Sequence, residues 1–127
     1  MKFILTSLLL ITFVAAHSQT DSAVYFNTEI TATFPGGKMA WQHYLQKNLT
    51  YPDLAVSNGI QGTVVVQFMV DSTGIAHDIT VISGPKELRE ESVRLIKNVS
   101  IWVPGIVYGK KVNSWKTQPF YFQLVTK

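Results

Sequence analysis

The sequence predicts a small α+β domain in which helices pack on one face of an antiparallel sheet. Residues 63–70 alternate in polarity as a half-buried strand does, and a turn and a second strand-like run follow. Segments with helical spacing of apolar side chains lie on both sides of this pair. The expected order is helix, helix, strand, strand, helix, strand. A mixed split-βαβ arrangement stays open, because the sequence does not determine the order of the strands in the sheet.

Two helices are expected before the strand pair. The first runs from Lys38 to Lys47, directly after a break at residues 34–37 in which a proline is followed by two glycines. Within it, aromatic and apolar side chains recur four residues apart. The second is short. It is expected to start at Pro52, which suits the first helical position, and to end near Gly59.

The strand pair is the clearest local signal. A first strand from Thr63 to Val70 carries its apolar side chains at every second position, and these are expected to face the core: Val64, Val66, Phe68 and Val70. Residues 71–74 form a turn that ends in a glycine. The second strand, residues 75–83, returns antiparallel, and a slip in its alternation near His77 and Asp78 predicts a β-bulge.

A third helix is expected from Lys86 to Val99, with acidic residues in its first turns and basic residues in its last, as the helix dipole favours. Glu90 and Arg94 are expected to pair, since they are four residues apart. After a turn that includes Lys110 and Lys111, the last strand is expected from Val112 to Val125. It contains Pro119, which cannot donate to a sheet ladder, so this strand is expected at an edge.

The first eighteen residues have the features of a cleavable signal peptide. Lys2 precedes an uncharged run at residues 3–16, which is shorter than the roughly 20 residues that a membrane-spanning helix needs. Ala16 and Ser18 are small residues at the spacing of a cleavage site, so cleavage is expected after Ser18. A retained anchor is the alternative. The prediction is therefore export from the cytoplasm, an N-terminal arm at residues 19–33, a domain at residues 34–127, and no membrane anchor after cleavage.

Composition narrows the function classes. The chain has no cysteine, so an apolar core rather than disulfides must stabilise it. Without Lys2, 10 Lys and Arg residues stand against 8 Asp and Glu residues, an excess too small to indicate nucleic-acid binding. No acidic residue follows Glu91, so the basic C-terminal third is either a solvated face or a surface that meets an acidic partner.

The sequence predicts no enzyme, no metal site and no cofactor. His43 and His77 do not share a metal-ligand spacing, and no cysteine is available as a ligand. The Asp-Ser-Thr-Gly stretch at residues 71–74 is explained by its place in a hairpin turn. We find no set of residues with the spacing that catalysis requires.

One further signal is an ordered set of positions spread over seventy residues: Tyr51, Pro52, Ala55, Gly59, Gln61, Gly62, Val64, Val66, Phe68, Val70, Asp71, Gly74, Val81, Gly84, Leu88, Trp102, Pro104, Gly105, Gly109, Val112, Pro119 and Phe122. Together with the phenylalanine-proline-glycine-glycine segment at residues 34–37, this set resembles the C-terminal domain of TonB, in the version that opens with such a segment. The resemblance covers about residues 24–124. Ser92 and Lys111 depart from the family pattern, which more often has alanine and proline there.

The resemblance implies a periplasmic protein-binding module of a transmembrane transport system, which captures a segment of an outer-membrane receptor by edge-strand pairing. The alternative is an interaction or regulatory domain that binds another envelope protein or the cell wall. An exposed edge also permits a homodimer. The residues expected to bind the partner are the edge strand and its flank: Asn48, Tyr51, Asn113, Ser114, Trp115, Lys116, Thr117, Gln118, Phe120 and Phe122.

The resemblance does not extend to a proline-rich spacer. TonB proteins also have an uncleaved membrane anchor and a long spacer, whereas the five prolines here are not clustered. Residues 19–33 reach at most about 50 Å when fully extended. The chain is therefore not expected to transmit energy by the family's usual route, unless the leader is retained and a partner does the rest.

Overall fold

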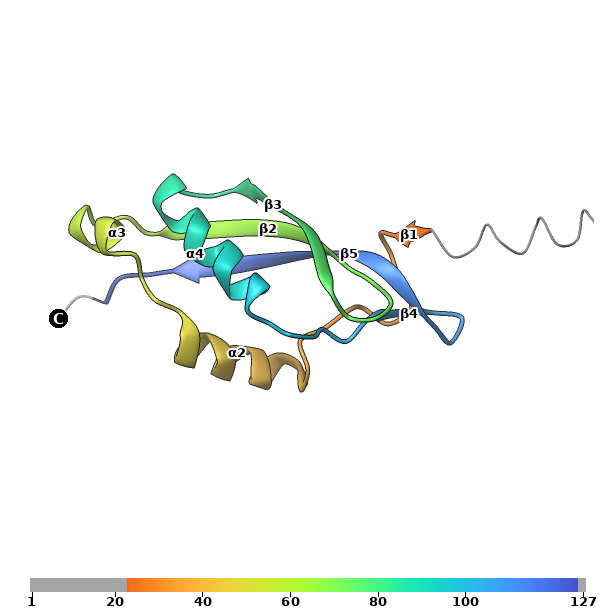
Figure 1. Cartoon of the computed structure of the whole chain (residues 1–127). Helices are drawn as coiled ribbons and strands as arrows, with labels where there is room; N and C mark the ends of the chain where they lie inside the picture. Colours follow the sequence, from red (N-terminus) through yellow and green to blue (C-terminus); the bar gives the residue numbers. More distant parts are fainter. Residues whose placement is uncertain (1–22, 126–127) are drawn as a thin grey trace, which may run out of the picture.

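The computed structural model describes residues 23–125, and the predicted signal peptide lies outside the described residues. Figure 1 shows a curved sheet with α4 across one face and α2 beside β5. None of the helices within residues 23–125 is both long and apolar enough to cross a bilayer. The elements are β1 (Val24–Tyr25), α2 (Gly37–Asn48), α3 (Asp53–Ser57), β2 (Gly62–Val70), β3 (Ala76–Ser83), α4 (Lys86–Lys97), β4 (Gly105–Val107) and β5 (Lys110–Phe122).

The sheet has the order β1-β5-β2-β3, with β4 paired to the start of β5. β2 pairs antiparallel with both β3 and β5, and β1 adds a short parallel pairing to β5. The expected α+β class is confirmed, as are the three helices and the three longest strands. β4 was not predicted, and β1 lies within residues 19–33, which were expected to form an N-terminal arm.

Two expectations about the last strand need correction. Lys110 and Lys111 are not in a turn but are the first residues of β5. The turn is Tyr108 and Gly109, whose positive φ angles of 50° and 74° suit a tight β-hairpin. β5 is also not an open edge from its start, because Asn113 and Ser114 pair with β1.

The core lies between the sheet and the helices. The four alternating apolar residues of β2 predicted to face inward are 0% exposed, which confirms the face assigned to this strand. From α4, Leu88, Leu95 and Ile96 are buried against them, and Trp102 closes the core beyond the helix. The predicted bulge in β3 is confirmed, because the β2–β3 register shifts there and Asp78 has a φ of 52°.

The turn between β2 and β3 is fixed by Asp71 and Gly74. One carboxylate oxygen of Asp71 accepts hydrogen bonds from the backbone N–H groups of Thr73 and Ile75. Gly74 has a φ of 95°, and its carbonyl accepts the Trp102 N–H at 2.8 Å. This contact attaches the segment after α4 to the turn and so positions the Trp102 ring.

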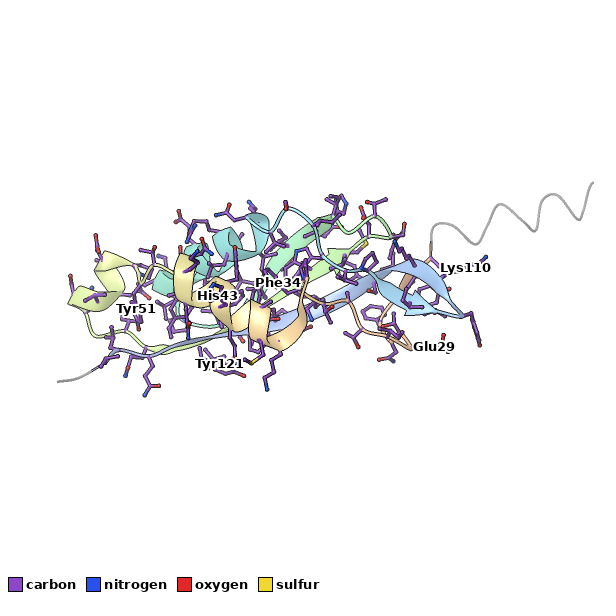
Figure 2. The ribbon with its side chains drawn as sticks, turned by 90° about the horizontal axis from the view of Figure 1, so that it is seen from below. Glu29, Phe34, His43, Tyr51, Lys110 and Tyr121 are labelled. Carbon is purple, nitrogen blue, oxygen red and sulfur yellow. The ribbon has the colours of Figure 1, made fainter. Side chains whose placement is uncertain are left out.

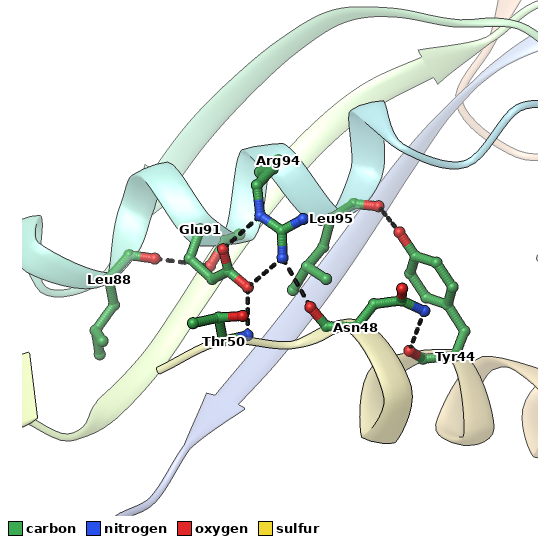
Figure 3. Close-up of polar contacts among 8 residues, drawn as sticks. Tyr44, Asn48, Thr50, Leu88, Glu91, Arg94 and Leu95 are labelled. Carbon is green, nitrogen blue, oxygen red and sulfur yellow. Dashed lines mark hydrogen bonds and ion pairs between the residues drawn. The ribbon is translucent and has the colours of Figure 1, made fainter. Parts of the chain in front are cut away.

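A polar cluster attaches the end of α2 to α4 (Figure 3). The buried Glu91 carboxylate accepts the Thr50 N–H at 2.6 Å and the Arg94 Nε–H at 2.6 Å. Arg94 also donates to the Asn48 carbonyl at 2.7 Å. The expected partner of Arg94 was Glu90; in the structure it is Glu91, three residues away, because Glu91 faces α2.

Candidate binding site

The free side of β5 is the first part of the candidate site. In an antiparallel ladder, a residue pair exchanges either both backbone hydrogen bonds or neither. Pro119 has no N–H, so its pair with Val65 exchanges no backbone hydrogen bonds. The register runs without a shift along β5, so Thr117 and Tyr121, two residues to either side of Pro119, exchange none with β2 either. Their N–H groups therefore point away from β2. Because β1 ends beside Ser114, residues 116–122 form the open edge.

A groove of about 460 Å³ runs along this open edge, between β5 and α2. Figure 2 views the molecule from the side of α2 and labels Phe34 and Tyr121, two of the residues that line it. A strand added to the open edge would therefore lie in the groove. The other main lining residues are Lys38, Trp41, Gln42, Leu45, Trp102, Lys116, Gln118, Pro119 and Phe120.

The inner wall of the groove is aromatic. The Phe34 ring lies 5.3 Å from Trp41 and 6.0 Å from Trp102, and Trp41 lies 5.8 Å from Phe120. Gly36 makes this possible: it has a φ of 92°, and a Cβ there would lie 2.8 Å from the Ala40 Cβ. The break predicted at residues 34–37 thus turns the chain so that Phe34 packs under α2.

Lys116 is the charged residue on the β5 side of the groove. It is opposite Phe68 in the β2–β5 register and on the same face of the sheet, so its aliphatic stem lies over the core. Burial lowers the pKa of the Lys116 ammonium group, because the charged form loses solvation. Neither of the ion pairs among residues 23–125 includes it.

The structure disperses the other predicted site residues of β5. Trp115 faces the open side of the sheet and stacks on Phe26, with ring centroids 6.2 Å apart. Thr117 is exposed, and Gln118 donates from its side chain to the Pro119 carbonyl at 3.1 Å, which occupies one acceptor of the edge. Phe120 and Phe122, at 1% and 3% exposed, belong to the core. A role in partner binding stays a prediction for each.

The two predicted flank residues, Asn48 and Tyr51, and the first two predicted residues of the edge strand are held by contacts within the domain. The Asn48 side-chain amide donates to the Tyr44 backbone carbonyl, and the Asn48 backbone carbonyl accepts from Arg94. The Tyr51 hydroxyl donates to the Ile60 carbonyl, and its ring packs against Phe122 at 5.5 Å. Asn113 accepts the Ser72 N–H at 2.8 Å, and Ser114 is buried. These contacts set the frame of the site, whereas partner binding by these residues stays a prediction.

Sequence reasoning missed the α2 side of the groove. Trp41 and Lys38 were assigned to a helix but not to the site, because nothing local relates them to β5. One signal was available: Trp41 and Leu45 form an apolar helix side directly after a break that carries Phe34. Within residues 23–125, no group of three or more His, Asp or Glu side chains is placed to hold a metal ion.

Comparison with known proteins supports the resemblance seen in the sequence. The profile of the family described as Gram-negative bacterial TonB protein C-terminal matches residues 47–124. The solution NMR structure of the Pseudomonas aeruginosa TonB CTD is similar, with 28% identity, a TM-score of 0.50, and coverage of 61% of this chain and 80% of that chain. A comparison with curated protein sequences gave no match.

A second solved structure is similar in fold. The NMR solution structure of the Helicobacter pylori TonB-CTD has a TM-score of 0.56 and covers 73% of this chain and 89% of that chain. Its 23% identity carries information on the fold alone. The family profile itself spans more than half of the chain, from the last residues of α2 to beyond the end of β5. The chain therefore belongs to the Gram-negative bacterial TonB protein C-terminal family.

Proposed function

We propose that this chain is a periplasmic interaction module of an outer-membrane transport system, which binds an extended receptor segment as an added strand on β5. The observation that carries the proposal is the open edge at residues 116–122 with a groove directly beside it. Membership of the TonB C-terminal family supports an association with envelope transport. Export through the predicted signal peptide is part of the proposal.

Strand addition explains why the edge and the groove occur together. The backbone groups of the edge supply hydrogen bonds to any extended peptide, whereas pockets for alternate side chains supply selectivity. On β5 the available donors are the N–H groups of Thr117 and Tyr121. Every second side chain of the added strand would enter the groove between β5 and α2, and the others would face the open side of the sheet.

The proposal predicts that Thr117→Pro weakens binding about tenfold, as the loss of one edge hydrogen bond together with the crowding by the proline ring implies. The change removes an N–H that points away from β2, so the β2–β5 ladder keeps its bonds. The preceding residue is already extended, as a proline requires. Binding is measured by titration with synthetic peptides that copy the periplasm-facing segments of outer-membrane receptors from the same organism.

Thr117→Val is the matched control, because it keeps the N–H and changes only an exposed side chain. A second arm leaves the protein unchanged and uses the same peptides with single N-methylated residues, which should weaken binding only at alternate positions. Equal affinity of the proline and valine variants, together with equal affinity of all N-methylated peptides, would contradict strand addition.

A further inference from the structure

Strand addition alone does not explain the charge in the groove. Of the residues that line it, two are charged, and both are lysines: Lys38 on α2 and Lys116 on β5. We infer that Lys116 is a specificity residue, which selects partner strands that place a side-chain carboxylate opposite it in the groove. The inference rests on the proposed function, because the carboxylate is carried by the added strand.

The position of Lys116 supports this role. It lies on the helix-facing side of β5, where its neighbours two and four residues on are Gln118 and the buried Phe120. A lysine on this face is costly, since burial disfavours its charged form, as the lowered pKa of Lys116 indicates. Among the residues that the structure describes, no carboxylate lies within ion-pair distance of the Lys116 ammonium group. An anion from a partner would offset the lost solvation.

The same geometry predicts what the rest of the partner strand carries. Side chains that enter the groove are two residues apart, because alternate residues of a strand face opposite sides. One groove-facing position lies opposite Lys116. The next two lie beside Gln118 and Phe120, where Trp41 and Leu45 form an apolar wall. The favoured partner strand therefore carries a carboxylate opposite Lys116. Its groove-facing side chains two and four residues from that carboxylate, in the direction of the C-terminal end of β5, are apolar.

A double-mutant cycle tests the inference. One axis is Lys116→Gln; the other replaces each acidic residue of a receptor peptide that binds, one at a time, by the matching amide. At one acidic position of the peptide, we expect Lys116→Gln alone and the amide substitution alone each to weaken binding about tenfold. The two changes together should weaken binding little more than either one alone. Lys116→Arg should keep the affinity within a few-fold. Lys47→Gln, an exposed lysine of α2 outside the groove, is the matched control and should change affinity less than twofold.

The outcomes separate the inference from the proposed function. If peptides bind and protect the Thr117 and Tyr121 amides, but no acidic position couples to Lys116, the inference is wrong and strand addition stands. If no peptide binds and these amides stay unprotected, the proposed function itself is wrong. The peptide changes leave the protein unaltered, so their result holds even if Lys116→Gln perturbs the fold.

Discussion

The cluster that joins α2 to α4 yields a sharp prediction about stability. Glu91→Gln keeps the size of the side chain but removes its charge. The Glu91 carboxylate, 8% exposed, accepts from Thr50 N–H and from two nitrogens of Arg94 at 2.6–2.7 Å. A glutamine amide has one oxygen for these donors, and its NH₂ group would face at least one of them.

The expected cost follows from these contacts. Hydrogen bonds to a charged group contribute about 1.5–3 kcal/mol each, and neutral ones about 1 kcal/mol. The Arg94 side chain is 41% exposed and can hydrogen-bond to water after the substitution, so most of the free energy of its bonds to Glu91 is recovered. We therefore expect Glu91→Gln to lower the free energy of unfolding by about 2 kcal/mol. For a domain of this size, the melting temperature should fall by roughly 10 °C.

Urea and thermal unfolding followed by circular dichroism measure this effect. Glu90→Gln is the matched control: it removes the same charge from the neighbouring, exposed position and should cost less than about 0.5 kcal/mol. The control also separates the two candidate partners of Arg94, since the sequence favoured Glu90 and the structure has Glu91. If Glu90→Gln destabilises as much as Glu91→Gln, the assigned role of the cluster is refuted.

Two further predictions concern the β2–β3 turn. Gly74→Ala should lower the free energy of unfolding by about 2 kcal/mol or more. Gly74 has a φ of 95°, and an added Cβ would overlap the Trp102 carbonyl oxygen and lie 2.7 Å from Ile101 Cγ1. Urea unfolding measures the change, and a neutral effect would contradict this packing. Burial alone would raise the pKa of Asp71, but hydrogen bonds from Thr73, Ile75 and His77 outweigh it and hold this pKa well below its usual value. The stability that comes from the charged carboxylate is fully present above the unfolded-state pKa of about 4 and is lost as the pH falls toward the folded-state pKa. Asp71→Asn should therefore make the free energy of unfolding less dependent on pH in the acid range. An unchanged pH dependence would contradict this.

Most of the fold could be predicted because its signals are local. The alternation in β2, the turn at Asp71 and the apolar side of α4 each lie within one segment. β1 could not be placed in the same way, since its two residues pair with Asn113 and Ser114, far along the chain. β4 is three residues long, which is too short for a period to be visible.

The candidate site was predictable in part, for a related reason. Pro119 alone indicated that β5 has an unpaired side, and the structure keeps that side open from residue 116 onward. A contiguous range of β5 mixes two faces, however, so the predicted set joined the buried Phe120 to the exposed Thr117. The α2 wall escaped prediction because Trp41 reaches Phe120 only through tertiary packing.

Amide hydrogen exchange along β5 is the most direct measurement of whether this strand receives a partner strand. In the free protein, the Thr117 and Tyr121 amides should exchange quickly, whereas the Gln118 and Phe120 amides, which bond β2, should be protected. With a saturating receptor peptide, the Thr117 and Tyr121 amides should become protected, while the Gln118 and Phe120 amides should change little. A bound peptide that leaves Thr117 and Tyr121 exchanging as in the free protein would contradict the claim that β5 receives the partner strand.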